Sequence, residues 1–225
     1  MVQAVYSTWE MERHHASERH LYPEVLEVLK KIKKDHPDAI IGAVTDGLAN
    51  PLFMTFTLAP FFDFSCSWED DQGGRKRFFM ELDKAAGKTE ELTWIYDDAR
   101  YMYSQLRKAA DGMKAPKQVD NPLQFPATYD DRVWIHVGDD LALDVGGSAA
   151  CGAKTILAEL DEQQYGQTAR FRFDRSKPQP SWSSASPEEM DMRFYMSQAA
   201  KDKVDVHLRF LSQLPEMIHD ILEAQ

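Results

Sequence analysis

The chain lacks most features of secreted, membrane-bound or nucleic-acid-binding proteins. Cysteine occurs only as Cys66 and Cys151, and neither has the spacing of a metal or disulfide motif, so we expect two reduced, buried thiols. Basic residues are in deficit: 26 Lys and Arg against 37 Asp and Glu give a formal net charge of −11. That balance argues against a nucleic-acid or anionic-membrane surface.

Long apolar runs are also missing. The longest, at 52–64, is interrupted by threonines and a proline and is too short to span a bilayer. Residues 1–22 carry glutamates and arginines where a signal peptide would have an apolar core. From these absences we expect a cytoplasmic protein without a membrane segment.

What the chain does have is a regular alternation of predicted elements. Its 225 residues are 43% hydrophobic and 28% charged, which suffices for one well-formed core. Continuous apolar runs predict strands buried on both faces, and helical apolar stripes lie between them. The alternation predicts an α/β fold, with a Rossmann-like parallel sheet and flanking helices. The expected strands are 39–44, 62–68, 92–96, 133–137 and 154–157. The expected helices are 1–20, 23–35, 50–58, 77–86, 101–110, 141–150 and 208–222, with a loop at 111–128 and a mobile polar stretch at 161–200.

Three polar segments follow predicted strands, where ligands bind in parallel sheets. Thr45, Asp46 and Gly47 offer a hydroxyl and backbone amides to an anion, or they are an ordinary Asp-Gly turn. Lys76, beside Arg75, can neutralise a phosphoryl oxygen, or it belongs to a solvated basic run. These two segments together suit a phosphate.

The third segment, Gly138-Asp139-Asp140 with Asp144, has the strongest pattern. An apolar strand delivers two adjacent carboxylates, and a third follows within one helical turn. Mg²⁺ is usually held by one or two carboxylates plus water and phosphate oxygens, so the segment suits that ion. The alternative is that Asp140 is a helix N-cap and the other two are solvated.

Taken together, the segments resemble the haloacid dehalogenase-like hydrolase superfamily, in its cap-bearing phosphatase type. The similarity lies in the second, third and fourth motifs of that family, which match Val44-Thr45-Asp46-Gly47, Arg75-Lys76 and His136-Val137-Gly138-Asp139-Asp140 with Asp144-Val145. The resemblance implies a core domain at 21–225 with inserts at 88–131 and 160–203. Residues 1–20 resemble the last helix of the family's helical cap.

The resemblance also implies roles. Thr45 would hydrogen-bond the transferred phosphoryl group, with Asp46 and Gly47 beside it, and Lys76 would stabilise the nucleophile. Asp139 would bind Mg²⁺, assisted by Asp140 or Asp144 directly or through water. The substrate class would be small phosphorylated metabolites. The choice between Arg75 and Lys76 stays open, because Arg77 replaces the proline that commonly follows the motif lysine.

The family's first motif, an Asp-x-Asp after an apolar strand, has no match before Thr45. It supplies the nucleophile and the general acid, and its strand is the central one of the family's sheet. Loss of such a nucleophile lowers turnover by roughly 10⁴- to 10⁶-fold. We therefore expect an impaired or inactive chain, either truncated or naturally degenerate, and we favour truncation because residues 1–20 begin within the cap.

Two rival functions are weighed against a phosphatase. One is a non-catalytic binding or scaffold protein, derived from such a phosphatase, whose inserts carry the partner contacts. The other is a phosphoacceptor receiver domain, which also groups carboxylates, a threonine and a lysine. In receivers the acidic cluster precedes the threonine, and here it comes last, so the order of the motifs argues against that alternative.

Overall fold

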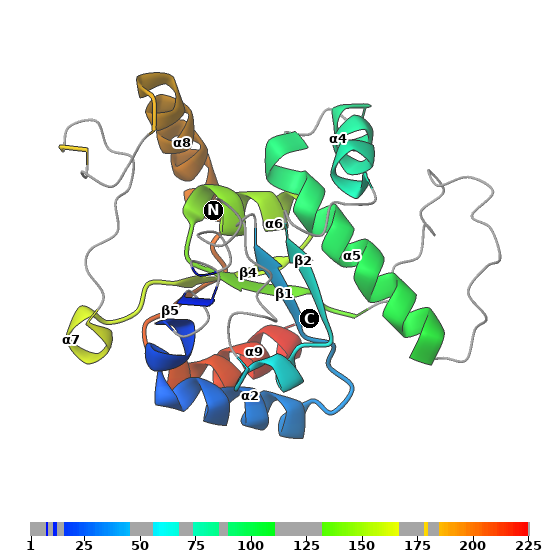
Figure 1. Cartoon of the computed structure of the whole chain (residues 1–225), viewed down its shortest axis with the longest axis vertical. Coiled ribbons are helices and arrows are strands. Elements are labelled where there is room, and N and C mark those ends of the chain that lie inside the picture. The colour runs from blue at the N-terminus through cyan, green and yellow to red at the C-terminus, as the bar shows by residue number, and fades with distance from the viewer. Residues whose placement is uncertain are drawn as a thin grey trace. The chain divides into compact units, whose positions relative to one another are not determined.

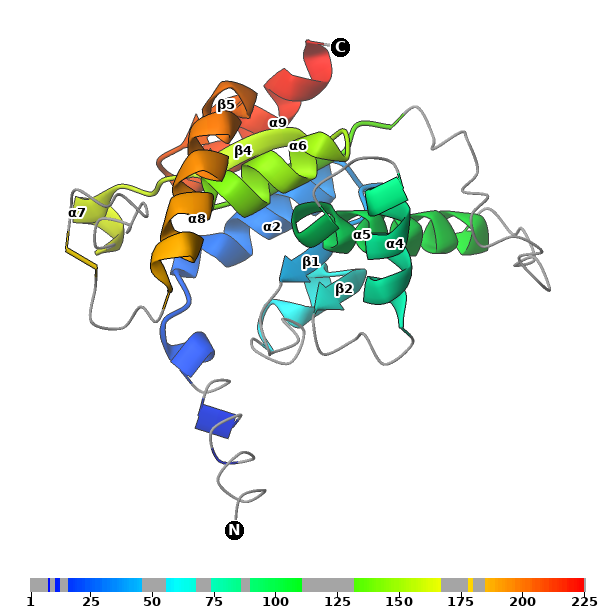
Figure 2. The same ribbon diagram turned by 90° about the horizontal axis from the view of Figure 1, so that it is seen from above.

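The structure is a computed structural model of the chain, and it describes residues 8, 11–12, 16–45, 56–67, 74–85, 90–110, 132–166, 178–179 and 185–224. The chain divides into two compact units, Met1–Arg132 and Val133–Gln225. Both units consist of parallel strands with flanking helices, so the α/β class is confirmed (Figures 1 and 2). None of the helices in these ranges is long and apolar enough to cross a membrane.

The first unit contains a two-stranded parallel sheet. β1 (Gly42–Thr45) pairs with β2 (Phe64–Ser67), and Thr45 lies opposite Ser67. α2 (Pro23–Asp35) precedes β1, and the 3₁₀-helix η1 (Ala59–Phe61) leads into β2. α4 (Arg75–Ala85) and α5 (Glu90–Ala110) follow, and α5 packs against both strands and against α4. Pro23 opens α2 as predicted, because proline suits the first position of a helix.

The predicted strand at 92–96 is wrong, because these residues belong to α5. Every described residue from Thr93 to Tyr96 is buried, and so are Asp98 and Ala99. A helix turn that is buried on all sides reads as a continuous apolar run, and such a run looks the same in a buried strand. The predicted helix at 101–110 is the second half of α5, and the loop at 111–128 lies outside the described residues.

The second unit contains a three-stranded parallel sheet. β3 (Ile135–Gly138), β4 (Lys154–Ala158) and β5 (Val206–Leu208) lie in the order β3-β4-β5. Between β3 and β4 the chain forms the π-helix η3 (Leu141–Gly147) and the short α6 (Ser148–Ala150). After β4 come α7 (Glu162–Tyr165), α8 (Pro187–Ala200) and the 3₁₀-helix η4 (Lys201–Lys203). After β5 come the 3₁₀-helix η5 (Leu211–Gln213) and α9 (Leu214–Glu223).

Two apolar clusters cover the two faces of this sheet. Leu157 of β4 packs with Leu141 and Val145 of η3 and with Ala200 of α8. Its neighbour Ile156 packs instead with residues of β5 and α9. Because successive strand residues point to opposite faces, helices flank β4 on both sides. The central strand is therefore buried on both faces, as its apolar sequence predicted.

Two predictions in this unit are corrected. The final helix begins at Leu214 and not at Leu208, because Leu208 ends β5, where it pairs with Ala158 and is fully buried. The stretch at 161–200, predicted to be mobile, contains α8. This helix starts at a capping serine: Ser186 Oγ accepts a hydrogen bond from the Glu189 amide, 3.2 Å away, and Pro187 takes the first helical position.

A single sheet was predicted, and the described strands form two. β1 pairs with β2, and β3 pairs with β4, but no described strand joins β1 to β3. The prediction of two reduced, buried thiols is confirmed in part: neither Cys66 nor Cys151 forms a disulfide, and both are buried. The predicted helix at 50–58 lies largely outside the described residues, and its last three residues, 56–58, form turns.

Candidate functional site

Thr45, predicted to bind phosphate, is the last residue of β1. It is half-buried at the carboxyl end of the strand, which is where ligands bind in parallel sheets. Asp46 and Gly47, predicted to contribute amides beside it, lie outside the described residues. The position of Thr45 thus agrees with the sequence prediction, and the predicted cradle around it is not tested.

Lys76, the predicted phosphate-binding lysine, is the second residue of α4. Its ammonium lies 4.9 Å from the ring centroid of Trp94 on α5, and Trp94 is only 2% exposed. A cation is disfavoured at a helix N-terminus, and the first turn of α4 contains no acidic residue. The negative face of the indole ring offsets part of that cost.

The predicted metal ligands lie together in residues 138–144, called here the acidic turn. The acidic turn runs from the last residue of β3 into the first half of η3, and η3 opens with a π-helical hydrogen bond in which the Asp140 carbonyl accepts from the Val145 amide at 3.1 Å. π-helical turns are rare and often occur at functional sites. The structure thus brings Asp139, Asp140 and Asp144 to one place at the carboxyl end of β3.

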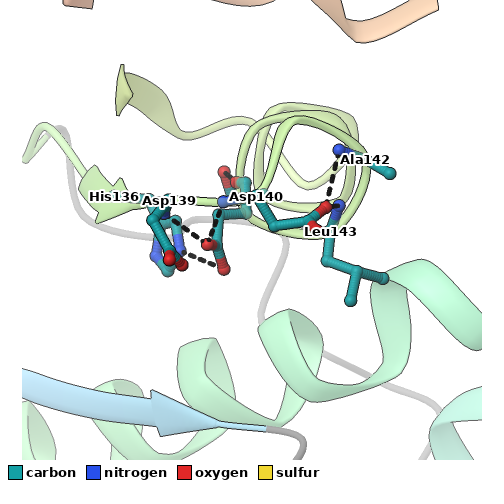
Figure 3. A network of polar contacts seen from close by, with 7 residues as sticks. His136, Asp139, Asp140, Ala142 and Leu143 are labelled. Atoms are coloured by element: carbon teal, nitrogen blue, oxygen red, sulfur yellow. Dashed lines mark hydrogen bonds and ion pairs between the residues drawn. The ribbon is translucent and has the colours of Figure 1, made fainter. Parts of the chain in front are cut away.

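Asp140 is the N-cap of η3. Its Oδ1 accepts hydrogen bonds from the amides of Ala142 and Leu143, both at 2.8 Å. Figure 3 shows the side chain directed at these two residues. A carboxylate here satisfies amides that have no partner within the helix and lies at the positive end of the helix dipole. The N-cap alternative for this residue is confirmed.

Asp144 closes the turn from the other side. Its Oδ2 accepts hydrogen bonds from the amides of Asp139, at 2.6 Å, and Asp140, at 2.8 Å. Its Oδ1 lies 3.6 Å from Nε2 of His136 on β3. The alternative that Asp144 is simply solvated is therefore wrong, since its carboxylate holds the backbone of the turn.

Asp139 differs from the other two carboxylates because its residue is exposed. Its backbone is anchored through the Asp144 carboxylate, while its side chain lies at the surface of the unit. Asp140 and Asp144 thus hold the backbone of the turn through hydrogen bonds, and Asp139 is the exposed residue of the three. Of the three, Asp139 is the one best placed to meet a ligand from solvent.

Arg193 of α8 is a residue of the site that the sequence did not reveal. Its Nη2 lies 2.7 Å from Asp140 Oδ2, on the oxygen that the two amides leave open. The two residues are 53 positions apart. Ser186 and Glu189 mark the start of α8 in the sequence, but nothing in the sequence pairs Arg193 with Asp140.

The predicted site residues fall into two sets. Thr45 and Lys76 belong to the first unit, and the acidic turn belongs to the second. Among the residues that the structure describes, no group of three or more His, Cys, Asp or Glu side chains is placed to hold a metal ion. The sharing of one ligand by the two sets stays a prediction.

Comparisons with protein-family models, with curated proteins and with solved structures found no match. The resemblance to haloacid dehalogenase-like hydrolases therefore rests on the three motifs and on the placement of their residues at strand ends and a helix start.

Proposed function

We propose that the chain is the core of a haloacid dehalogenase-like phosphatase that acts on small phosphorylated metabolites. The observation that carries the proposal is the acidic turn, in which Asp140 and Asp144 fix the backbone and Asp139 is exposed at the carboxyl end of β3. The order of the motifs, a threonine after β1, a lysine at the start of α4 and the acidic turn after β3, supports the same class.

The proposed phosphate ligands are Thr45, Asp46, Gly47 and Lys76. Thr45 would donate its hydroxyl hydrogen to a phosphoryl oxygen, and Lys76 would neutralise the negative charge. Arg75, Lys76 and Arg77 occupy the first turn of α4 without an acidic residue among them. An anion at that helix start would be favoured by the dipole and by the basic side chains together.

The acidic turn suits Mg²⁺, but only some of its carboxylate oxygens could bind the ion directly. Its ligands would be oxygens, as the ion prefers, but Oδ1 of Asp140 and Oδ2 of Asp144 each already accept two amide hydrogen bonds. Asp139, whose residue is exposed, would bind Mg²⁺ directly, and Asp140 and Asp144 would act through water. When bound, the ion would neutralise charge on the phosphoryl oxygens.

The chain lacks the Asp-x-Asp of the family, so the proposed phosphatase would be impaired or inactive in this form. The N-terminal remnant of a helical cap belongs to the same proposal: residues 16–19 are helical, as a cap helix would be.

The direct test is Mg²⁺-dependent binding of inorganic phosphate, measured by calorimetry on the whole chain. We expect wild type to bind phosphate only with Mg²⁺ present, and Asp139→Asn not to bind phosphate even with Mg²⁺ present. Asp202→Asn is the matched control, because Asp202 is also an exposed aspartate of the second unit and lies on η4. Phosphate binding that is indifferent to Mg²⁺ and to Asp139 would refute the site. Rapid hydrolysis of p-nitrophenyl phosphate, abolished by Asp139→Asn, would show that the chain is active after all.

A non-catalytic scaffold is the second candidate, and one observation favours it. Met192 and Tyr195 lie three residues apart on α8, within the 160–203 insert, and are 45% and 69% exposed. Large exposed apolar side chains that are neighbours on one helix face are typical of contact surfaces. If the scaffold reading holds, replacing both by serine will abolish capture of a partner that wild type retains. Unchanged capture would leave the reading without support.

A further inference from the structure

Arg193 forms a partly buried ion pair with one carboxylate of the acidic turn, that of Asp140. Its guanidinium meets Asp140 Oδ2 at 2.7 Å, and the two side chains are 18% and 28% exposed. A pair so shielded interacts more strongly than a surface pair, because less water screens it. The charge of Asp140 is therefore balanced by the protein itself.

α8 is firmly seated against the turn that it neutralises. Ala200 at its end packs with Leu141 and Val145 of η3 in one buried cluster. The apolar contact holds the helix in place, and Arg193 projects from the same helix to Asp140. Helix packing thus holds the backbone from which Arg193 reaches the turn.

We infer that Arg193 is a positioning residue and an internal counter-cation of the acidic turn, which lowers the affinity of the turn for a divalent cation. The inference rests on the proposed function, since it concerns the Mg²⁺ site assigned to Asp139. A divalent ion at Asp139 must approach a turn whose charge Arg193 has already reduced by one. In addition, it meets the guanidinium as a nearby like charge, which costs free energy.

The chain offers a close control for this arrangement. Asp161 caps α7 by accepting from the amides of Gln163 and Gln164, both at 3.0 Å, and it pairs with Arg209 at 3.0 Å. Asp161 and Arg209 therefore repeat the chemistry of Asp140 and Arg193, in the same unit but outside the acidic turn. Any general effect of losing an arginine from a capping aspartate will be seen there as well.

The experiment is a titration of the whole chain with Mn²⁺ alone, in which electron paramagnetic resonance measures the concentration of unbound ion. We expect Arg193→Gln to bind Mn²⁺ about tenfold more tightly than wild type, as removal of one nearby positive charge allows. Arg193→Lys keeps the charge and should stay within about twofold of wild type. Arg209→Gln should bind as wild type does.

The outcomes separate the inference from the proposed function. If wild type and Arg193→Gln bind Mn²⁺ equally, Arg193 is merely structural and the inference is wrong, while the cation site stands. If neither binds, the cation site fails and the inference with it. If Arg193→Gln binds Mn²⁺ and wild type does not, Arg193 prevents cations from binding at the acidic turn, and the inference is supported.

A second measurement covers the case in which Arg193→Gln does not fold. In wild type with ¹⁵N-labelled arginine, saturating Mg²⁺ should shift the Nε resonance of Arg193, assigned through Arg193→Lys, and leave that of Arg209 unchanged. If saturating Mg²⁺ leaves the Arg193 resonance unshifted, the inference is wrong. This result does not require a variant that removes the arginine charge.

Discussion

The carboxyl group of Asp144 lies so close over the α-carbon of Gly138 that no β-carbon fits between them. A β-carbon built on Gly138 would overlap the Asp144 side chain, including its carboxyl carbon. The close approach lets Asp144 reach back to the amides of Asp139 and Asp140. The glycine that ends β3 is thus required by the carboxylate that organises the turn after it.

Replacement of Gly138 by alanine should therefore destabilise the second unit. The new methyl group would displace Asp144 and leave two amides without their acceptor, and we expect a loss of about 1–3 kcal/mol in the free energy of unfolding. Urea denaturation measures it. Gly146→Ala is the milder comparison, because a β-carbon there would meet Ala200 and Leu141 at 3.3 and 3.4 Å, tight contacts that small shifts can relieve. Equal losses for the two variants would contradict the special role of Gly138.

Asp140 and Asp139 of the acidic turn should differ in how much they contribute to stability. Asp140→Ala should cost at least about 0.5–2 kcal/mol, because it removes a helix cap and also the ion pair with Arg193, and Asp161→Ala removes the equivalent cap and ion pair at α7. Asp139→Ala should change stability by less than about 0.5 kcal/mol, as is usual for an exposed residue. Thermal or urea unfolding of the three variants decides the matter. A cost for Asp139→Ala as large as that for Asp140→Ala would remove the distinction.

Much of the fold was predictable because local patterns and tertiary packing agree. Pro23 opens α2, and the apolar runs around Val44 and Ile156 are strands in parallel sheets. The prediction failed where burial erased the pattern, as for Trp94 in α5, whose neighbours are all buried. It failed again at Leu208, where three residues of β5 are too short to show a period of their own. Periodicity reports on half-buried elements and says little about elements that are buried all round.

Within the candidate site, the location of the acidic turn was predictable from the sequence, and the partners of its carboxylates were only partly so. The acidic turn could be placed after β3 because the strand and its carboxylates are adjacent in the sequence. The hydrogen bonds that hold Asp140 and Asp144 follow from cap geometry, which the N-cap alternative had anticipated for Asp140. Arg193 could not be predicted, because its contact depends on how α8 packs on η3. Long-range ion pairs leave no local signal in a single sequence.

Lys76 provides a test of the anion site proposed at the start of α4. We expect Lys76→Met to weaken inorganic phosphate binding about tenfold or more, because it removes a charge-assisted contact, and to lower stability by about 0.5–2 kcal/mol through loss of the Trp94 contact. Lys84→Met is the control on the same helix, since Lys84 lies in the last turn and is exposed. Calorimetry measures the phosphate affinity, and the site assignment fails if Lys84 matters as much as Lys76.

Glu18 should make the stability of the first unit depend on pH. Its carboxylate accepts hydrogen bonds from the backbone amide and the hydroxyl of Thr57, each at 2.9 Å, and these lower the pKa of Glu18 below its ordinary value. A group whose pKa is lower in the folded state stabilises that state above the unfolded pKa, and the stabilisation is lost as the pH falls through the folded pKa. In Glu18→Gln, the free energy of unfolding of the first unit should therefore fall less steeply than in wild type as the pH is lowered. The difference should begin just above the ordinary glutamate pKa and extend to lower pH.

The pKa of Glu18 itself can be followed by carbon-13 NMR of its carboxyl group. Thr57→Val removes the hydroxyl and keeps the amide, and the amide is the larger cause of the shift. We therefore expect the pKa of Glu18 to rise only part of the way to its ordinary value. Asp35 is the internal control, because its pKa is lowered by the hydrogen bond from Lys31 and should not respond to the change. A full return of Glu18 to its ordinary pKa would mean that the Thr57 amide does not bond the carboxylate in solution, and the link between residues 16–19 and the turn at 56–58 would have to be abandoned.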